Sequence, residues 1–217
     1  MDQPKLKKYW RFFQDLLFPI YCLDCQTEGQ DWLCPRCLAR IKRWSGRASL
    51  SGDYLDQIVI AADYGNPVIR QAIHLLKYQF ISDLAYPLGK ILVEPASRWS
   101  SQWVFVPIPL HRFRHRWRDF NQVELILRQA SEAINLDVRT DILLKTKNTR
   151  PQMSLNKAER EVNILDAFTV NKTSLGKIEN IILVDDVVTT GQTLNQAAKV
   201  LKQAGVRRVE GLVLAHG

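Results

Sequence analysis

Between residues 181 and 194 the sequence reads Ile181-Ile182-Leu183-Val184-Asp185-Asp186-Val187-Val188-Thr189-Thr190-Gly191-Gln192-Thr193-Leu194. Four branched apolar residues in a row predict a strand that is buried on both faces. Apolar residues then recur at helical spacing up to Leu201, and Gly205 suits the left-handed position that follows a helix. A buried strand, a polar loop and a helix in this order indicate an α/β fold. We expect a mostly parallel sheet with helices on both faces.

The polar residues of this stretch have the chemistry of a site for a phosphorylated sugar. The N–H groups at a helix N-terminus attract anions, Gly191 lets the backbone approach a ligand, and threonine hydroxyls add donors. Asp185 and Asp186 follow the strand at its carboxyl end, where parallel sheets bind ligands, and paired carboxylates suit sugar hydroxyls with Mg²⁺ nearby. An Asp can also be a simple N-cap, and threonine-rich turns are common. The whole run nevertheless favours a site made of Asp185, Asp186, Thr189, Thr190, Gly191, Gln192 and Thr193.

The composition is that of an ordinary globular protein. The chain has 217 residues, of which 46% are hydrophobic and 24% are charged, and no apolar run is long enough to span a membrane. Residues 1–19 mix basic and aromatic residues without the apolar segment of a signal peptide, so we expect a cytoplasmic protein. The segment is interpreted as an amphipathic helix that packs on the protein's own surface, with membrane association as the alternative. The formal net charge of +8 favours anionic partners.

All four cysteines lie in two Cys-x-x-Cys pairs, Cys22 with Cys25 and Cys34 with Cys37. Two such pairs can place four thiolates around one tetrahedral zinc ion, and four protein ligands make the expected role structural. Two disulfides are the competing account, but a reducing cytosol favours metal binding. We expect an N-terminal helix and a zinc ribbon over residues 1–45, a linker around 44–56, and the α/β domain over 46–217.

The remaining pattern predicts further elements of the α/β domain. Expected strands cover residues 56–64, 103–107, 138–144, 168–170 and 209–214, and expected helices cover 68–78, 82–94 and 122–134. Lys77 is interpreted as a cation near the end of its helix, where the helix dipole favours it.

Two basic segments connect these elements. The first, from Leu110 to Arg118, follows a buried strand and contains four arginines, two histidines, Phe113 and Trp117. A charge run is often only a solvated face, but the position at a strand's carboxyl end favours ligand binding, and the aromatic residues also fit nucleic-acid contact. The second, Lys145 to Arg160, is typical of a mobile loop that closes over phosphates, although an ordinary exposed connection has a similar composition.

The run from Asp185 to Thr193 resembles the phosphoribosyl pyrophosphate motif of the type I phosphoribosyltransferases. Three features together resemble the ComF family, competence-associated proteins with such a domain: the cysteine pairs, the acid run, and Val106-Pro107-Ile108-Pro109-Leu110 followed by Phe120-Asn121-Gln122. Leu76-Lys77-Tyr78 and Thr149-Arg150-Pro151-Gln152 also look like family positions. The sequence departs from the family at Asp119, where glycine is usual, and at Phe80, where glycine is often found.

The resemblance implies a role for each segment. Asp185 and Asp186 would face the ribose, residues 189–193 would hold the 5-phosphate, His111 and Arg112 would belong to a pyrophosphate loop, and residues 148–160 would form a lid. Two hypotheses follow. The protein is either a phosphoribosyltransferase that uses phosphoribosyl pyrophosphate with Mg²⁺, or a non-catalytic accessory protein that binds single-stranded nucleic acid and is regulated by this ligand. Single-stranded DNA and DNA-uptake proteins are the expected partners. The acceptor is not identified by any residue, and a homodimer is left open.

Overall fold

The computed structural model describes residues 19–42, 47–48, 53–110, 120–146 and 167–217. The chain divides into two compact units, Met1–Ile41 and Lys42–Gly217. The expected N-terminal helix, the basic segment from His111 to Asp119 and the whole expected lid at 148–160 lie outside the described residues. Within the described residues, no helix combines the length and the apolar character needed to cross a membrane.

The smaller unit is built from very short elements. β1 (Ile20–Tyr21) pairs antiparallel with β2 (Glu28–Gly29), and α2 (Pro35–Arg40) begins directly after Cys34. A proline at the first position suits a helix start, because its missing N–H would have no partner there. Among the described residues of this unit, few apolar side chains are buried, so the folding of this part depends on more than a hydrophobic core.

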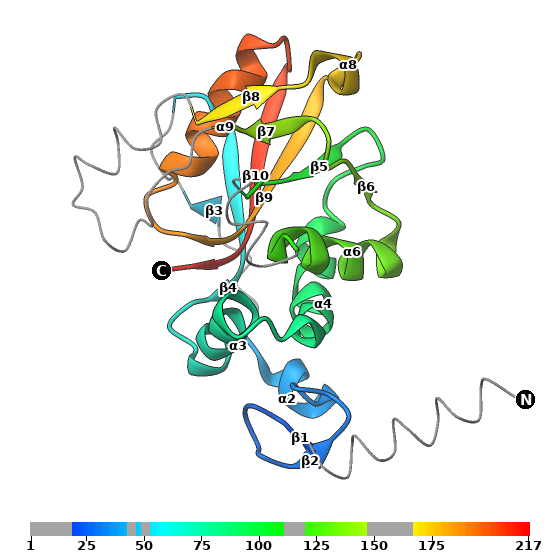
Figure 1. Ribbon diagram of the computed structural model, residues 1–217, viewed down its shortest axis with the longest axis vertical. Coiled ribbons are helices and arrows are strands. Elements are labelled where there is room, and N and C mark those ends of the chain that lie inside the picture. Colours follow the sequence, from blue (N-terminus) through cyan, green and yellow to red (C-terminus); the bar gives the residue numbers. More distant parts are fainter. Residues whose placement is uncertain (1–18, 43–46, 49–52, 111–119, 147–166) are drawn as a thin grey trace, which may run out of the picture. The chain divides into compact units, whose positions relative to one another are not determined.

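The larger unit has a six-stranded sheet in the order β3-β4-β10-β9-β5-β6, which confirms the expected α/β fold (Figure 1). The strands are β3 (Arg47–Ala48), β4 (Gln57–Asp63), β10 (Arg208–His216), β9 (Asn180–Val188), β5 (Val104–Pro107) and β6 (Asp137–Val138). All neighbours are parallel except β3, which pairs antiparallel with β4. The stretch expected to be only a linker therefore contains an edge strand.

Helices connect the parallel strands in two directions. α6 (Gln122–Ile134) leads from β5 outward to β6, whereas α9 (Gln192–Gln203) leads from β9 to β10 on the other side (Figure 1). Right-handed crossovers that run in opposite directions lie on opposite faces of a sheet. α3 (Pro67–Tyr78), η1 (Ser82–Leu84) and α4 (Ala85–Ala96) follow β4, and α4 packs against α6. The face of α9 predicted to be apolar is buried, and Gly205 has the expected left-handed backbone with φ of 103°.

Two predicted strands differ from the structure. The stretch 138–144, expected to be one strand, is not one: β6 ends at Val138, and β7 (Leu143–Lys145) pairs with β8 (Phe168–Val170) in a separate antiparallel hairpin. The chain turns between them, where Arg139 and Asp141 form an ion pair of 3.2 Å. The motif strand is longer than expected, because β9 stays paired with β10 as far as Val188.

α4 packs closely against the middle of α6. Gly89 of α4 lies so near α6 that an added Cβ would be 2.6 Å from Gln129 Cβ and 2.8 Å from the Ile126 carbonyl oxygen. Since a backbone oxygen cannot move aside alone, any side chain at this position must push the two helices apart.

We therefore expect Gly89→Ala to lower the free energy of unfolding by about 1–3 kcal/mol, the usual cost of overpacking. Urea denaturation monitored by circular dichroism measures the change. As a matched control, Glu132→Ala, at an exposed position of α6, should change stability by less than about 0.5 kcal/mol. Equal stability of Gly89→Ala and the unmodified chain would show that the two helices are not in close contact.

Candidate functional site

Buried polar side chains mark one end of the sheet. In the described part of the chain, the buried polar or charged residues are Asn121, Gln122, Asp186 and Glu210. Glu210 lies near the amino end of β10, where Gln57, Trp99 and Arg208 all donate hydrogen bonds to its carboxylate, which is the pattern of a structural group. The other three meet at the carboxyl ends of β5 and β9.

Asp185 and Asp186 lie where β5 ends and β9 continues. β5 pairs with β9 only as far as Val184, whose carbonyl accepts the Ile108 N–H at 2.8 Å, while β10 accompanies β9 to Val188. The helices that follow β5 and β9 leave this point in opposite directions. Such a switch point opens a crevice at the carboxyl edge of a parallel sheet, and it is where ligands bind in open α/β sheets.

Successive side chains of a strand point to opposite faces of the sheet, so the carboxylates of Asp185 and Asp186 lie on different faces. Ile181 and Leu183 belong to the core that α9 covers, so Asp185, which follows at the same spacing, faces the α9 side. Asp186 points to the other face, toward α3 and α6, and its partners come from those two helices. The two acids are adjacent in sequence but meet different parts of the protein.

Asp186 is held by an ion pair and a buried hydrogen bond. Lys77 Nζ, from the last turn of α3, lies 2.9 Å from Asp186 Oδ1, and Gln122 Nε2 donates to Oδ2 at 3.1 Å. The carboxylate is only 6% exposed. Burial would raise the pKa of Asp186, but the charge of Lys77 and the hydrogen bonds from Lys77 and Gln122 outweigh it and lower the pKa below its usual value. Burial likewise opposes the charge of Lys77, yet Asp186 raises the pKa of that ammonium. Both groups stay ionised.

The start of α6 is fixed by its cap. Asn121 Oδ1 accepts the Val123 N–H at 3.1 Å, and Asn121 Nδ2 donates to the Ile108 carbonyl at 3.1 Å. The cap therefore ties the end of β5 to the helix and places Gln122 beside Asp186. The helix-dipole interpretation of Lys77 was incomplete, and no role was expected for Gln122. Their only signal in the sequence was the resemblance of Leu76-Lys77-Tyr78 and Phe120-Asn121-Gln122 to family positions.

Asp185 is half-buried and lines a hollow of about 250 Å³ formed with residues 187–194. Gly191, with φ of 75°, precedes the first turn of α9 and allows the loop to turn tightly into the helix. Burial and the neighbouring charge of Asp186 raise the pKa of Asp185 to about 7, and Lys77 and the more distant Lys145 of β7 offset only part of this. The Asp186 N–H donates to Asp185 Oδ1 at 2.9 Å. A carboxyl that exchanges its proton near neutral pH therefore faces the hollow.

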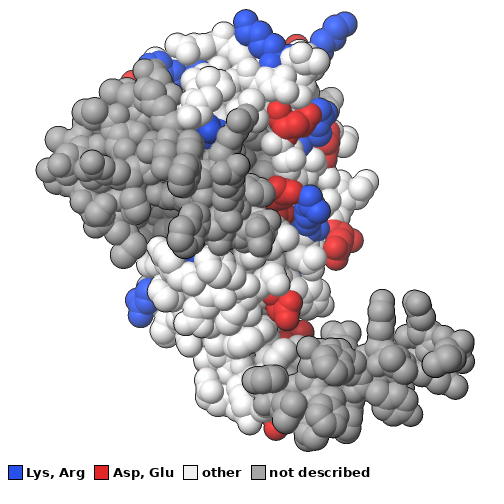
Figure 2. Space-filling view, in the orientation of Figure 1, with Lys and Arg blue, Asp and Glu red and all other residues white. Residues whose placement is uncertain are grey.

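The hollow brings together six of the residues expected to bind a phosphorylated sugar: Asp185, Thr189, Thr190, Gly191, Gln192 and Thr193. Asp186 does not line it. His111 and Arg112 lie outside the described residues, as do the other three arginines of the basic segment up to Arg118. On the face shown in Figure 2, the described Lys and Arg side chains lie among Asp and Glu side chains rather than in one basic patch.

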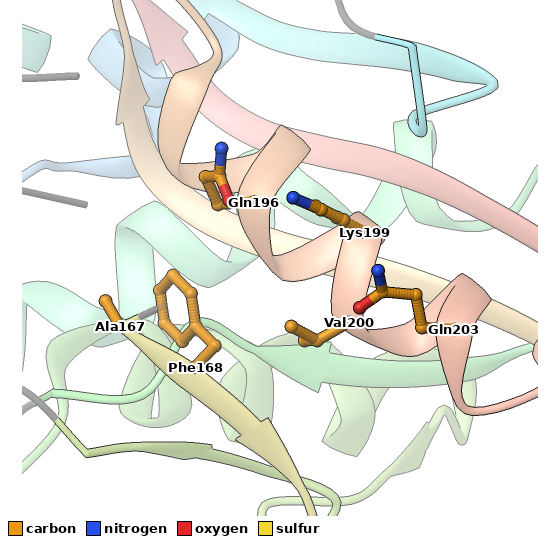
Figure 3. Close-up of a pocket in the computed structure, with 6 residues that line it drawn as sticks. All are labelled: Ala167, Phe168, Gln196, Lys199, Val200 and Gln203. Carbon is orange, nitrogen blue, oxygen red and sulfur yellow. The ribbon is translucent and has the colours of Figure 1, made fainter. Parts of the chain in front are cut away.

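A second hollow, of about 350 Å³, lies between β8 and α9 (Figure 3). Its lining residues are Ala167, Phe168, Gln196, Lys199, Val200 and Gln203. None of these is an acid, a histidine or a cysteine, so the second hollow lacks the paired carboxyl chemistry of the first.

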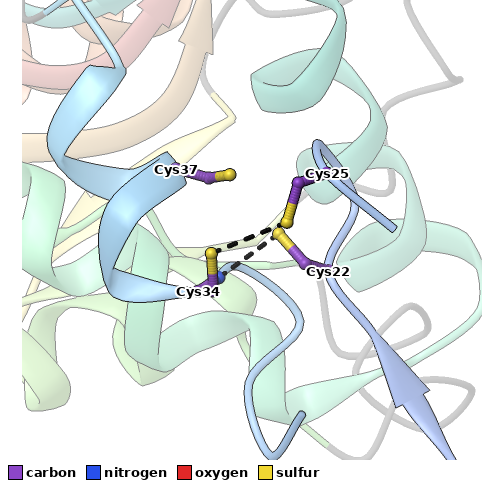
Figure 4. Close-up of side chains that lie close together, drawn as sticks. All are labelled: Cys22, Cys25, Cys34 and Cys37. Atoms are coloured by element: carbon purple, nitrogen blue, oxygen red, sulfur yellow. Dashed lines mark hydrogen bonds between the residues drawn. The ribbon is translucent and has the colours of Figure 1, made fainter. Parts of the chain in front are cut away.

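The four cysteines of the smaller unit converge (Figure 4). All four sulfur atoms lie within 4.8 Å of one another, and the Sγ atoms of Cys25 and Cys34 are 3.8 Å apart. Thiolates at about 2.3 Å from a tetrahedral zinc ion would be separated by roughly this distance. None of the four forms a disulfide, and the Cys34 N–H donates to Cys22 Sγ at 3.4 Å. Hydrogen bonds from Thr27 lower the pKa of Cys25 to about 6. The cluster therefore fits a metal such as zinc.

The part of the chain that contains this site matches a known domain family. The family model of the phosphoribosyl transferase domain matches residues 107–217, which include the end of β5, α6, the acid pair and α9. The chain is therefore a phosphoribosyltransferase-domain protein.

Individual relatives show to which family of phosphoribosyltransferase-domain proteins the chain belongs. It is 30% identical over 209 residues to competence protein F of Haemophilus influenzae, covering 92% of this chain and 85% of that protein. It is 30% identical over 183 residues to the DNA utilization protein YhgH of Escherichia coli, covering 82% and 74% respectively. With competence protein ComFC of Streptococcus pneumoniae it shares 33% identity over 142 residues, covering 64% of this chain and 60% of that protein. The chain belongs to the ComF family.

The cysteine cluster leads to a prediction about metal. Purified protein should contain about one zinc ion per chain, because four thiolates complete a tetrahedral site. Cys34→Ser should lose the metal and expose the smaller unit to proteolysis, since a unit with so small a core gains its folding energy from the ion. Metal analysis and limited proteolysis measure the two effects. Reduced protein with no zinc and an equally resistant smaller unit would contradict this account.

The raised pKa of Asp185 leads to a prediction about pH. In the unfolded chain an Asp has a pKa of about 3.9. The native state therefore binds more protons than the unfolded state between about pH 4 and pH 7, and stability must fall as pH rises through this window. We expect a falling melting temperature from about pH 5 to pH 8, with a clearly smaller fall in Asp185→Asn.

Asp83→Asn, which changes an exposed carboxyl away from the sheet edge, serves as the control and should follow the unmodified chain. If Asp185→Asn and the unmodified chain show parallel pH profiles, Asp185 titrates as an ordinary carboxyl.

Proposed function

We propose that the chain binds phosphoribosyl pyrophosphate with Mg²⁺ at the carboxyl edge of β9 and transfers the phosphoribosyl group to an acceptor. The proposal rests on the different surroundings of the two acids. Asp186 is ionised and fixed by Lys77 and Gln122, while Asp185 faces a hollow that opens at the start of α9. Phosphoribosyl pyrophosphate joins a sugar with hydroxyls to a 5-phosphate, and the hollow offers a partner to each.

Each part of the hollow has a role in this proposal. The N-terminal N–H groups of α9 and the hydroxyls of Thr189, Thr190 and Thr193 bind the 5-phosphate, aided by the positive end of the helix dipole. Asp185 accepts hydrogen bonds from the ribose hydroxyls once it is ionised. Asp186 positions its neighbour, because the Asp186 N–H donates to Asp185 Oδ1.

Mg²⁺ fits the same edge, since carboxylate oxygens are its usual protein ligands. When bound with the substrate it would neutralise charge on the pyrophosphate. The chain itself contributes by holding the sugar in one orientation, and positioning together with charge neutralisation accounts for most of the rate in transfers of this kind.

The names of the relatives suggest the process that this activity serves. Competence protein F, competence protein ComFC and the DNA utilization protein YhgH are named for competence or for the use of DNA. We place this chain in a similar process and in the cytoplasm, where its four free thiols would remain reduced. Single-stranded DNA is a second proposed ligand, supported by the alternation of arginine and aromatic residues in 112–118.

Ligand binding is tested by thermal stabilisation. A ligand at one hundred times its dissociation constant stabilises the native state by about 2.7 kcal/mol. We expect Mg²⁺ and phosphoribosyl pyrophosphate to raise the melting temperature of the unmodified chain, and this shift to be lost in Asp185→Asn. At pH 8 the apo form of Asp185→Asn should be at least as stable as the unmodified chain. Asp83→Asn should retain the shift.

Pyrophosphate release then separates an enzyme from a binding protein. Release that requires both the ligand and an added acceptor indicates transfer. If the ligand raises the melting temperature but no acceptor leads to pyrophosphate release, the chain is a regulated binding protein. If the melting temperature of Asp185→Asn rises as much as that of the unmodified chain, the ligand binds elsewhere.

A further inference from the structure

The backbone of Phe80 is unusual for a residue with a large side chain. It follows Gln79, the C-cap of α3, and its φ of 58° lies in the left-handed region that glycine adopts freely. This conformation turns the chain back over the helix end, where the N–H groups of Gln79 and Ile81 both donate to the Leu75 carbonyl. A side chain in this region is strained, and such residues persist where the surrounding structure imposes them, often at functional sites.

Contact with a second ring, rather than burial, distinguishes the Phe80 side chain. It is 45% exposed, yet its ring centroid lies 6.5 Å from that of Phe120, and the two rings meet edge to face at 86°. Aromatic pairs favour this geometry, and it stabilises them beyond the area that they bury. Phe120 directly precedes Asn121, the N-cap of α6. The ring pair therefore ties the end of α3 to the start of α6.

The same two helix ends hold the Asp186 carboxylate between them. Lys77 lies three residues before Phe80, and its Nζ is 2.9 Å from Asp186 Oδ1. Gln122 lies two residues after Phe120, and its Nε2 donates to Oδ2 at 3.1 Å. Each helix thus holds one oxygen of the carboxylate. The spacing of the two helix ends therefore determines how the plane of this carboxylate is oriented.

The position of Asp186 affects the hollow at the start of α9 through two hydrogen bonds. The Val187 N–H donates to Asp186 Oδ1 at 2.6 Å, and the Asp186 N–H donates to Asp185 Oδ1 at 2.9 Å. Asp185 and Val187 both line the hollow. A rotation of the Asp186 carboxylate would therefore disturb two residues of the lining.

We propose that Phe80 is a positioning residue, whose contact with Phe120 fixes the spacing of α3 and α6 and so aligns the Asp186 carboxylate with the hollow. In this role the ring acts through Lys77 and Gln122 and needs no contact with a ligand. The strain at Phe80 is retained because glycine, which would relieve it, has no ring to hold the two helix ends together. The effect on ligand binding depends on the proposed function, whereas the effect on Asp186 does not.

The first test follows the side-chain amide of Gln122 by NMR in the isotope-labelled, unliganded full chain. In Phe80→Gly, hydrogen exchange of this amide should be about two- to tenfold faster, the factor expected when one aromatic pair is lost. Phe80→Tyr keeps the ring and should retain the slow exchange of the unmodified chain. Tyr86→Ala removes an exposed aromatic side chain of α4 and should leave the exchange unchanged.

The melting temperature shows whether the effect is local. Glycine relieves the left-handed strain, which offsets the lost ring contact, so apo Phe80→Gly should not melt below the unmodified chain. A lower melting temperature together with faster exchange would mean that the ring only stabilises the fold, and it would overturn the proposal. Unchanged exchange of the Gln122 amide in Phe80→Gly would overturn it as well.

Ligand binding provides the last readout. In the presence of Mg²⁺, the dissociation constant of phosphoribosyl pyrophosphate should rise in Phe80→Gly by about the same factor as the exchange rate and be normal in Phe80→Tyr. Faster exchange without a change in this constant would contradict the positioning role. If the unmodified chain does not bind phosphoribosyl pyrophosphate, the proposed function fails, and the Gln122 amide and the melting temperature decide whether Phe80 positions Asp186.

Discussion

The ion pair between Lys77 and Asp186 is the interaction on which the site depends. A carboxylate this deeply buried remains ionised only if a charge and hydrogen bonds replace water. Lys77 comes from α3 and Gln122 from α6, so the charge is satisfied only when both helices are docked at the carboxyl edge of β9. Removal of one partner from such a pair costs about 3–5 kcal/mol, because it leaves the other charge buried alone. The fold of the larger unit and the electrostatics of the site are therefore coupled.

The same edge contains two features that reduce the stability of the fold. Asp185 is close to a like charge and gives up stability when it ionises, and Phe80 holds a backbone conformation that glycine would adopt without strain. Strain of the Phe80 kind costs about 1–3 kcal/mol. Both features lie within a few residues of the Lys77–Asp186 pair. Residues that lower the stability of the fold are common at the sites where proteins bind ligands.

Much of the fold could be predicted from local patterns. The apolar run before Asp185, the polar loop and the apolar face of α9 each depend on residues close in sequence, and the structure confirms them. The convergence of the four cysteines also followed from their spacing, because two short turns suffice to bring the thiols together. These are cases in which the chemistry is local.

The pairing of distant side chains could not be predicted in this way. Gln122 and Asp186 are 64 residues apart, and only the strand order brings them together. For the same reason the pattern could not show that neighbouring acids face opposite sides, since this depends on which face α9 covers. The run at 138–144 was misassigned as one strand because a polar turn inside it sends the second half to another sheet.

The most direct test of the account is a titration of the aspartate carboxyl carbons by carbon-13 NMR, with and without Mg²⁺ and phosphoribosyl pyrophosphate. In the apo protein, one carboxyl that is absent from Asp185→Asn should titrate near pH 7, and the Asp186 carboxyl should titrate below the usual range of an aspartate. The ligand should lower the pKa of the Asp185 carboxyl, because hydroxyl and metal contacts favour its ionised form. An Asp185 pKa that is near 4 in the apo protein, or that does not move when the ligand binds, would contradict the account.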